Sequence, residues 1–532
     1  MLEIRTTRSG TRTAYANGSY LHSPYDPGKE AGRFVRQALK DQHPSIILLL
    51  GAGIGYIYEE LTRKHPKARV IALFYDETVH NAFCTGLPER TFWHPGRSES
   101  LLTFLRTQIH ELEAEGLVLV EWPPSARIFP TQGLEANQAV HQLLREIRGS
   151  LVTTSALGRR WLRNSLTNFI CIDKIFQLAE SSDRNITVIA ASGPTLKESI
   201  DFLRSHRDRI ELWAVPSSLS FLLEHGLIPD MTILTDPSYY AFSHLQCAKE
   251  HNLHVAMPIS AAVGSWRIGS RVSLLSQDAP FERILLKTAG IEAPSTPPQG
   301  TVSATALVLA LQRRRGLVVF SGLDFCYRDI FSHARPNNFE NWLEVNRLQP
   351  LHHQLFSLAT DHTVRTEGGI RSNLALNTYA GWFSGVDGPD STRIRRLHPS
   401  PTELPGITEI SEQELDRLVL GIGNRSPEAL REVKDHPARQ RRFRIVDSLL
   451  TGWIRRSEEI AEAVAGSGAL EALLSDSESL SLIFLCNAAA ITEMRRILRV
   501  EGQDAAVKRT LEVMESHVEF LHALSEKFVE RK

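Results

Sequence analysis

The stretch Ile186-Thr-Val-Ile-Ala-Ala191 is a short run of apolar and β-branched residues, the composition expected of a strand buried on both faces. The polar segment Ser192-Gly193-Pro194-Thr195 interrupts it, and apolar residues at helical spacing follow over residues 196–204. Thr195 and Glu198 have the spacing of a capping box, and the proline before Thr195 suits the entry to a helix. The sequence therefore predicts a buried strand, a tight turn and a helix in direct succession.

Two more strands of the same kind follow. Leu212–Val215 is closed by Pro216-Ser217-Ser218, and Met231–Leu234 is closed by Thr235-Asp236-Pro237. A helix over residues 219–225 separates them. Strands and helices that alternate at this spacing predict a parallel sheet with right-handed crossovers. The polar turns then meet at the carboxyl edge of the sheet, where open parallel sheets bind their ligands.

The bulk composition is that of a globular protein of two to four domains, with 532 residues, 42% hydrophobic and 23% charged. Sixty Lys and Arg against 61 Asp and Glu leave no basic excess, so we expect no nucleic-acid partner. We also expect no membrane span, no signal peptide and a cytoplasmic location. Five scattered cysteines without a CxxC pair predict neither disulfides nor a zinc site: Cys84, Cys171, Cys247, Cys326 and Cys486.

An earlier glycine-rich turn resembles a nucleotide-binding βαβ unit. The apolar run 45–50 leads into Gly51-Ala-Gly53-Ile-Gly55, a helix over 57–65 and a strand over 69–73, with Asp76 where a ribose-binding acid would lie. The dinucleotide pattern is incomplete because Tyr56 stands where a third glycine of the motif is expected. We interpret the turn as structural, and a bound nucleotide is the alternative.

The remaining patterns complete an α/β fold in three regions. We expect a Rossmann-like N-terminal domain over residues 1–155, a doubly wound parallel-sheet domain over 156–402 and an α-helical domain over 403–532. Short strands or a hairpin within residues 1–45 begin the first domain, and a helix over 134–148 ends it. In a helix over 158–180, Asn164 and Asn168 share one face, and we interpret them as holding that helix against a loop rather than lining a site.

Five motifs follow one another in a fixed order: Ala191-Ser-Gly-Pro-Thr-Leu196, Pro229-Asp230 running into Thr235-Asp236-Pro237, Gly300-Thr-Val-Ser-Ala-Thr305, Gly322-Leu-Asp-Phe325 and Ser332-His-Ala334. Together they resemble the motility-associated-factor (Maf) glycosyltransferases, which modify bacterial flagellin. The central domain of that family is related to the MptE-like 6-hydroxymethylpterin pyrophosphokinases and resembles the sialyltransferase fold. Members often have glycine where this chain has Ala191.

The resemblance implies transfer of a nonulosonic acid, of the pseudaminic or legionaminic type, from its CMP-activated form to Ser or Thr of flagellin, without a metal or other cofactor. The residues expected to bind the donor are Ser192, Gly193, Pro194, Thr195, Ser217, Asp236, Thr301 and Ser303. The helix after Gly193 would present free N–H groups to the CMP phosphate. His333 and Asp324 are the expected catalytic residues, and His333 is the expected base, with a pKa of about 6–7.

Structural alternatives exist for each of these residues. Asp236 and Asp324 hold ribose hydroxyls or sugar amides, bind Mg²⁺ near a triphosphate, or cap turns at strand ends. A histidine such as His333 is often structural. Two other functions therefore stay open: a hydroxymethylpterin pyrophosphokinase that uses ATP and Mg²⁺, and a scaffold that binds a nucleotide without turnover.

Overall fold

The computed structural model describes most of the chain, namely residues 2–40, 42–83, 91–111, 113–178, 186–264, 267, 271–313, 316–361, 363–365, 370–386, 389–424, 430–467, 470 and 477–529. Cys84 and the end of the helix expected over 158–180 lie outside these residues. The four described cysteines are free thiols. The chain forms two compact units, residues 1–158 with 456–519 and residues 159–455 with 520–532.

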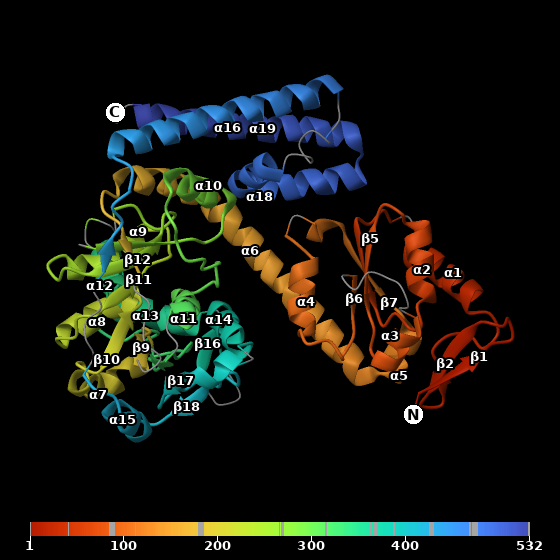
Figure 1. Cartoon of the computed structure of the whole chain (residues 1–532), viewed down its shortest axis with the longest axis horizontal. Coiled ribbons are helices and arrows are strands. Elements are labelled where there is room, and N and C mark those ends of the chain that lie inside the picture. Colours follow the sequence, from red (N-terminus) through yellow and green to blue (C-terminus); the bar gives the residue numbers. More distant parts are fainter. Residues whose placement is uncertain are drawn as a thin grey trace. The chain divides into compact units, whose positions relative to one another are not determined.

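The first unit begins with an antiparallel sheet, as the sequence predicted, and continues with a parallel one (Figure 1). The antiparallel strands are β1 (Glu3–Thr6), β2 (Arg12–Ala16) and β3 (Ser19–Tyr20). The parallel strands are, in spatial order, β6 (Phe92–Trp93), β5 (Arg69–Leu73), β4 (Ile46–Leu50) and β7 (Leu117–Glu121). The shorter helices of this unit are α1 (Pro27–Ala38), α2 (Tyr56–Lys64), α3 (Glu77–Phe83), α4 (Leu101–Gln108), η2 (Ala114–Gly116) and α5 (Pro123–Ile128).

The strand β4 shows why this sheet is buried on both faces. All five of its residues are buried, and alternate residues belong to different cores. Ile47 and Leu49 pack with one set of helices, whereas Ile46, Leu48 and Leu50 pack with the other. A continuous apolar run without alternation is the pattern of such a strand. The Rossmann-like prediction for this region is confirmed.

The helix α6 (Pro130–Cys171) joins the two helices that the sequence predicted separately over 134–148 and 158–180. No proline interrupts its 42 residues. Gly158, which lies near its middle, permits close packing, because a Cβ there would lie 1.7 Å from the carbonyl oxygen of Leu485 on α18 (Ser477–Val500). Gly158 thus serves contact between helices.

The second unit is built on an eight-stranded sheet whose strands are all parallel, as the sequence predicted (Figure 1). In spatial order they are β13 (Arg271–Leu275), β12 (His254–Pro258), β11 (Met231–Ile233), β10 (Ile210–Ala214), β9 (Ile186–Ala190), β14 (Leu317–Ser321), β17 (Ile394–Leu397) and β18 (Thr408–Ile410). Two small antiparallel pairs accompany it, β15 (Thr363–Arg365) with β16 (Arg371–Asn373) and β8 (Phe176–Gln177) with β19 (Arg431–Glu432).

Helices connect and cover these strands. After β9, β10 and β11 come η3 (Pro194–Ser199), α7 (Ile200–Ser205), η4 (Pro216–Ser218), α8 (Leu219–Glu224), α9 (Tyr239–Leu245) and η5 (Gln246–Ala248). After β13 and β14 come α10 (Pro280–Ala289), α11 (Val302–Arg313), α12 (Asn338–Asn346), α13 (Leu351–Thr360), α14 (Leu374–Ser384) and η7 (Pro389–Arg393). The apolar helix α11 contacts β9, β11 and β14 and shares a core with α14.

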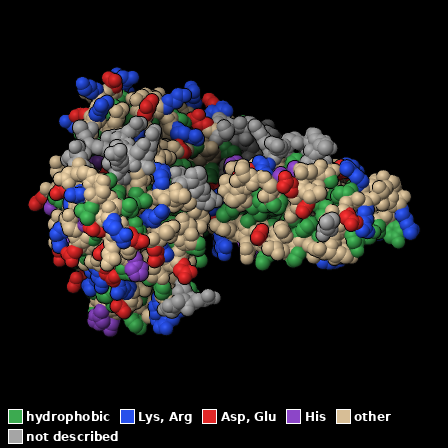
Figure 2. All heavy atoms as spheres, turned by 60° about the horizontal axis from the view of Figure 1, so that its bottom comes forward, with side chains coloured by type: hydrophobic (Ala, Val, Ile, Leu, Met, Phe, Trp, Pro, Cys, Tyr) green, Lys and Arg blue, Asp and Glu red, His purple; other side chains and the backbone are tan. Residues whose placement is uncertain are grey.

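The C-terminal region is mainly helical, which confirms the predicted fold class. Its helices are α15 (Glu412–Leu420), α16 (Arg439–Ser467), α18 and α19 (Gln503–Val529). None of the described helices is both long and apolar enough to cross a membrane. Acidic and basic side chains are interspersed over the face shown in Figure 2, and neither charge dominates there.

Candidate active site

The order of the strands locates the candidate site. The chain runs outward from β9 to β13 and then returns to place β14 on the other side of β9, before β17 and β18. The direction of strand order therefore reverses between β9 and β14. Parallel α/β sheets bind ligands at such a switch point, outside the carboxyl ends of the strands. Residues 192–195 follow β9 and residues 322–324 follow β14, so the predicted motifs meet there.

Hydrogen bonds bridge the two loops at the switch point. The Gly193 N–H donates to the Gly322 carbonyl at 2.8 Å. Thr195 donates its N–H to Asp324 Oδ2 at 2.7 Å and its hydroxyl to Asp324 Oδ1 at 2.5 Å. Asp324 is only 2% exposed, and this burial raises the pKa of its carboxyl even though the bonds from Thr195 act in the opposite direction. In this structure both carboxyl oxygens hold the loops together.

The loop that the sequence predicted to bind the CMP phosphate is held by contacts within the protein. A Cβ on Gly193 would lie 2.5 Å from Asp324 Oδ2 and 2.6 Å from the Gly322 carbonyl oxygen, so the missing side chain makes room for β14's loop. The Thr195 N–H donates a hydrogen bond to Asp324, and the Leu196 N–H donates one to the Gly193 carbonyl. The free N–H groups expected at these two positions are therefore already paired.

The helix expected over residues 196–204 also differs. It is a 3₁₀ segment, η3, followed by the six-residue α7. Thr195 forms no capping box, because its hydroxyl is bonded to Asp324 and η3 has no side-chain cap. The tertiary bond outcompetes the local one, since a buried carboxylate needs donors more than a partly solvated helix end does.

A cluster of ionisable side chains lies beside this bridge. His333, in the loop after β14, is half-buried, and burial lowers its pKa to about 4, with the nearby His244 lowering it further. Burial also lowers the pKa of His244 on α9, whereas the Asp236 carboxylate raises it. Burial and the Asp236 carboxylate together raise the pKa of Tyr379 on α14. His333, His244, Asp236 and Tyr379 therefore come together from four segments.

His333 has the properties of a neutral base. Its Nδ1 lies 2.9 Å from the Ser332 hydroxyl, so a proton on Nδ1 that is donated to this oxygen leaves a lone pair on Nε2. With a pKa of about 4 the imidazole stays neutral at physiological pH. This pKa lies below the value of about 6–7 expected from the sequence, because burial disfavours the protonated imidazole.

Asp236 combines a turn with an exposed carboxylate at the end of β11. Its Oδ1 accepts the Ser238 N–H at 2.7 Å, and its carbonyl accepts the Ala262 N–H at 3.0 Å. Oδ1 of Asp236 thus has the turn-capping role that was one of the alternatives for this residue. The carboxylate is still close enough to His244 and Tyr379 to shift their pKa values.

The other predicted donor residues reach the same edge by different routes. The half-buried Ser192 accepts the Ala334 N–H at its carbonyl (2.7 Å), which brings the His333 loop onto the end of β9. Thr301 is half-buried. Its neighbour Gly300 has a φ of +78°, and a Cβ added there would lie 3.7 Å from the Tyr379 ring. Ser303 is buried in the first turn of α11, and Pro194 begins η3.

Ser217 lies in η4 at the carboxyl end of β10, half-buried. Its neighbour Ser218 is fully buried and donates its hydroxyl to the Ala190 carbonyl at 2.9 Å, so it fixes this turn to β9. Ser217 therefore has an accessible side chain, whereas Ser218 is structural. The sequence could not show which of the two serines is accessible, because both follow Pro216.

The two asparagines of α6 support this edge, as predicted. Asn164 Nδ2 donates to the carbonyls of Pro237 (3.0 Å) and Ser260 (3.2 Å). Asn168 Nδ2 donates to the carbonyls of Ile259 (2.8 Å) and Ala261 (2.9 Å). Both side chains are buried and hold the loops after β11 and β12 against the helix.

His244 and Tyr379 were missed by the sequence reasoning. Neither belongs to one of the quoted motifs; His244 on α9 is remote in sequence from His333, and Tyr379 on α14 is remote in sequence from Asp236. The sequence offered one weak signal for His244. The helix α9 begins three residues after Asp236, so a polar side chain on this helix could lie near the carboxyl end of β11.

The N-terminal glycine turn is filled by protein side chains. A Cβ on Gly53 would lie 2.2 Å from His22 Nε2, and one on Gly51 would lie 2.5 Å from Ser125 Cβ. His22 is buried, stacks on Trp122 and accepts the Ile54 N–H at 3.2 Å. These contacts support the interpretation of the turn as structural. Asp76, expected near a ribose, accepts the Val79 N–H at 3.0 Å at the start of α3.

Comparisons with known proteins agree with this architecture. Residues 159–329 match the family described as 6-hydroxymethylpterin diphosphokinase MptE-like. An uncharacterized protein of Treponema pallidum (strain Nichols) is 27% identical over 315 residues, which are 58% of this chain and 67% of that protein. Another from the same organism is 29% identical over 122 residues, 23% of this chain and 58% of that protein.

A solved structure, described as a MAf glycosyltransferase from Magnetospirillum magneticum AMB-1, has the same fold. The TM-score is 0.61 at 13% sequence identity, and the match covers 99% of this chain and 93% of the other. The resemblance stated from the sequence is thus confirmed, by the fold over almost the whole chain and by the MptE-like match of its central region.

Proposed function

We propose that this protein is a glycosyltransferase that moves a nonulosonic acid, of the pseudaminic or legionaminic type, from CMP to a Ser or Thr hydroxyl of flagellin. Its fold is that of a protein described as a MAf glycosyltransferase, which supports the reaction class. The observation that carries the proposal is a neutral imidazole, His333, gathered with His244 and Asp236 at the carboxyl edge beside the switch point.

The chemistry follows from that arrangement. The bond between the anomeric carbon of the sugar and the CMP phosphate oxygen breaks, and CMP leaves with the bonding electron pair. The acceptor oxygen attacks the oxocarbenium-like carbon while its proton passes to Nε2 of His333. Positive charge on the sugar makes full deprotonation of the hydroxyl unnecessary, so a weakly basic imidazole is sufficient. A base in this position contributes about 10²–10⁴ in rate.

The surrounding residues have distinct roles in this proposal. Ser332 orients the imidazole through Nδ1. Ser192, Ser217 and Thr301 offer half-buried hydroxyls at the same edge to the donor, whereas Ser303 is buried in the first turn of α11. Asp236 has the exposed carboxylate for ribose hydroxyls or sugar amides. Asp324, Gly193 and Thr195 keep the loops of β9 and β14 together rather than touching the phosphate directly.

A second candidate is a diphosphokinase acting on a hydroxymethylpterin, which the match of residues 159–329 supports. That reaction moves a diphosphoryl group and needs Mg²⁺ to bridge and neutralise the phosphates. Departure of CMP from a sugar leaves a single phosphate group, which protein groups can stabilise. The two functions therefore differ in their nucleotide and in their need for metal.

The test is a pair of assays on the full-length protein, each with Mg²⁺ and with EDTA. We expect a CMP-activated nonulosonic acid and purified flagellin to give a mass increase of one sugar residue in both conditions. We expect ATP with hydroxymethylpterin to give no diphosphate product. Transfer that stops in EDTA and returns with Mg²⁺, or pterin diphosphate formed from ATP, would favour the second candidate.

A further inference from the structure

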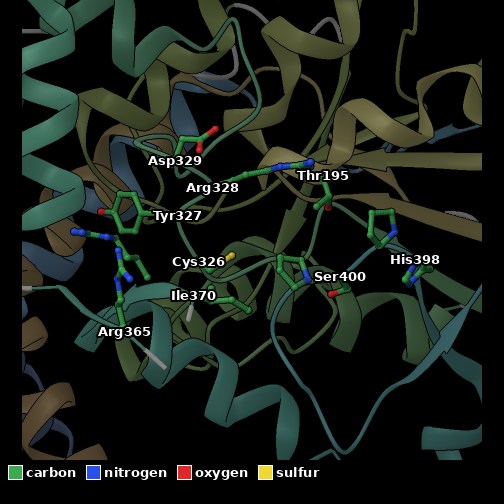
Figure 3. Close-up of a pocket in the computed structure, with 12 residues that line it drawn as sticks. Thr195, Cys326, Tyr327, Arg328, Asp329, Arg365, Ile370, His398 and Ser400 are labelled. Carbon is green, nitrogen blue, oxygen red and sulfur yellow. The ribbon is translucent and has the colours of Figure 1, made fainter. Parts of the chain in front are cut away.

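A pocket of about 620 Å³ lies at the carboxyl ends of β14 and β17, and it is distinct from the cluster of His333, His244, Asp236 and Tyr379. None of His333, His244, Asp236 and Tyr379 is among the described residues that line it. Figure 3 shows Tyr327 and Arg365 on one side, His398 and Ser400 on the opposite side and Cys326 between them. This volume is in the range of about 300–1,000 Å³ that is typical of small-molecule sites.

The lining is strongly basic. Arg328, Arg365, Arg371 and His398 face a single acidic residue, Asp329, among the described residues of the wall. Arg328 is neutralised by an ion pair with Glu198, and His398 Nδ1 lies 3.4 Å from Glu409. Arg371 donates Nη1 to the Ala359 carbonyl at 3.2 Å, which leaves its other nitrogens for a ligand.

Arg365 and Arg371 occupy an unfavourable position for a protein without a ligand. They are directly opposite each other in the antiparallel pair β15–β16, so both guanidinium groups project from the same face of the ribbon. Like charges in such a pair repel each other. Arg365 is exposed, and its guanidinium group forms no hydrogen bond or ion pair with another described residue. An anion between the two guanidinium groups would relieve this repulsion, and arginine binds carboxylate and phosphate through paired N–H groups.

The remainder of the pocket suits an organic body rather than a bare ion. Cys326, Ile370, Pro399 and Pro401 give it apolar surface. Burial and the nearby Asp324 raise the pKa of the Cys326 thiol to about 12, so the thiol is neutral and packs as an apolar group. The Tyr327 ring is half-buried, with its hydroxyl accepting from Asn373 Nδ2 at 3.4 Å.

The wall is fixed in place by bonds to the end of β14. Thr402 donates its hydroxyl to the Asp324 carbonyl at 2.5 Å. Ser400 donates to the Leu323 carbonyl at 3.4 Å and accepts from the buried Arg396 at 2.8 Å. The pocket is therefore largely preformed, which limits the loss of conformational entropy when a ligand binds.

We propose that this pocket is a second ligand site, which holds the phosphate or carboxylate of a small organic anion between Arg365 and Arg371, with the body of the ligand against Cys326 and Ile370. A nucleoside monophosphate and a free sugar acid both combine such an anionic group with an organic body. Thr195 belongs to the pocket wall and also to the switch-point bridge, so the ligand lies next to the site proposed for transfer. The site does not depend on the proposed transferase activity.

Calorimetric titration of the full-length protein tests the proposal, with CMP, N-acetylneuraminic acid and inorganic phosphate as separate probes. Arg365→Gln removes one guanidinium that has no described partner, and Arg283→Gln on α10 removes one exposed arginine outside the pocket as the matched control. We expect CMP or N-acetylneuraminic acid to bind, with affinity about tenfold or more weaker in Arg365→Gln, as for a lost charge-assisted hydrogen bond. Arg283→Gln should match the wild type.

The two organic probes distinguish the source of the anion, since the one that responds to Arg365→Gln identifies the ligand class. Addition of Arg371→Gln should remove the remaining binding of that probe to this pocket, so that only binding at the proposed transfer site is left. Binding of neither organic probe, equal weakening by the two single variants, or binding of inorganic phosphate as tight as that of the organic probes would overturn the proposal. Because this measurement uses no acceptor and no turnover, its failure is separate from failure of the transfer assay.

Discussion

The role of each residue at the switch point depends on which neighbour forms hydrogen bonds with its polar groups. Gly193, Thr195 and Asp324 were identified from the sequence as site residues, and the structure does bring them together. Their hydrogen bonds, however, join the two loops: Gly193 donates to Gly322, and Thr195 donates to Asp324. A sequence motif shows that polar groups meet at a strand end, but it does not show whether a ligand or a second loop receives them. Tertiary contact decides that.

The Thr195 hydroxyl should contribute measurably to stability. Thr195→Val keeps the shape of the side chain but leaves Asp324 Oδ1 without this donor in a buried position. We expect the free energy of unfolding to fall by about 1–3 kcal/mol, the cost of an unpaired buried acceptor. Urea-induced unfolding checks this. Thr195→Ser, which keeps the hydroxyl, should lose much less, and equal losses in the two variants would show that the hydroxyl is not the cause.

At the scale of elements, most of the apolar buried strands were predictable, whereas the two strands beyond β14 at that edge of the sheet were not. β4, β5, β9, β12 and β14 are continuous apolar runs, a strong signal for strands covered on both faces. β17 and β18 have only four and three residues, and β17 carries two arginines, so nothing in their composition marks a strand. Pairing with β14 is what makes β17 part of the sheet.

The N-terminal glycine turn gives the clearest test at this scale. Gly53 has a φ of +59°, and an added Cβ would meet His22 Nε2. Gly53→Ala should therefore lower the free energy of unfolding by at least about 1–2 kcal/mol, the cost of the left-handed conformation alone. Gly149→Ala is the control, because Gly149 lies within α6 with open space around it and should gain about 0.5–1 kcal/mol.

Thermal or urea unfolding measures both variants, and calorimetry with CMP and ATP measures their ligand binding. We expect nucleotide affinity to be unchanged in each, since the turn is filled by His22, Tyr75 and Ser125. A stable Gly53→Ala protein that has lost a nucleotide site would show that the turn binds a ligand after all.

For the whole molecule, the fold class was within reach of the sequence, whereas the assembly of the site was only partly so. The alternation of strands and helices specified a parallel sheet, and its polar turns specified an edge. The sequence did not reveal that α6 is one helix through Gly158, or that α9 and α14 bring His244 and Tyr379 to that edge. It also gave no sign of the pocket lined by Arg365 and Arg371, because that pocket needs the short strands β15 to β17 in place.

The measurement that tests the central claim most directly is transfer of sugar to flagellin by wild-type protein and by His333→Asn, followed by intact-mass spectrometry. His251→Asn, an exposed histidine, is the matched control. We expect His333→Asn to bind the CMP-sugar normally but to transfer about 10²–10⁴ times more slowly, while His251→Asn matches the wild type. Wild-type transfer should stay high down to pH values approaching the His333 pKa of about 4, within the range where the protein remains folded. If His333→Asn retains more than about a tenth of wild-type transfer, a loss too small for a general base, His333 is not the base.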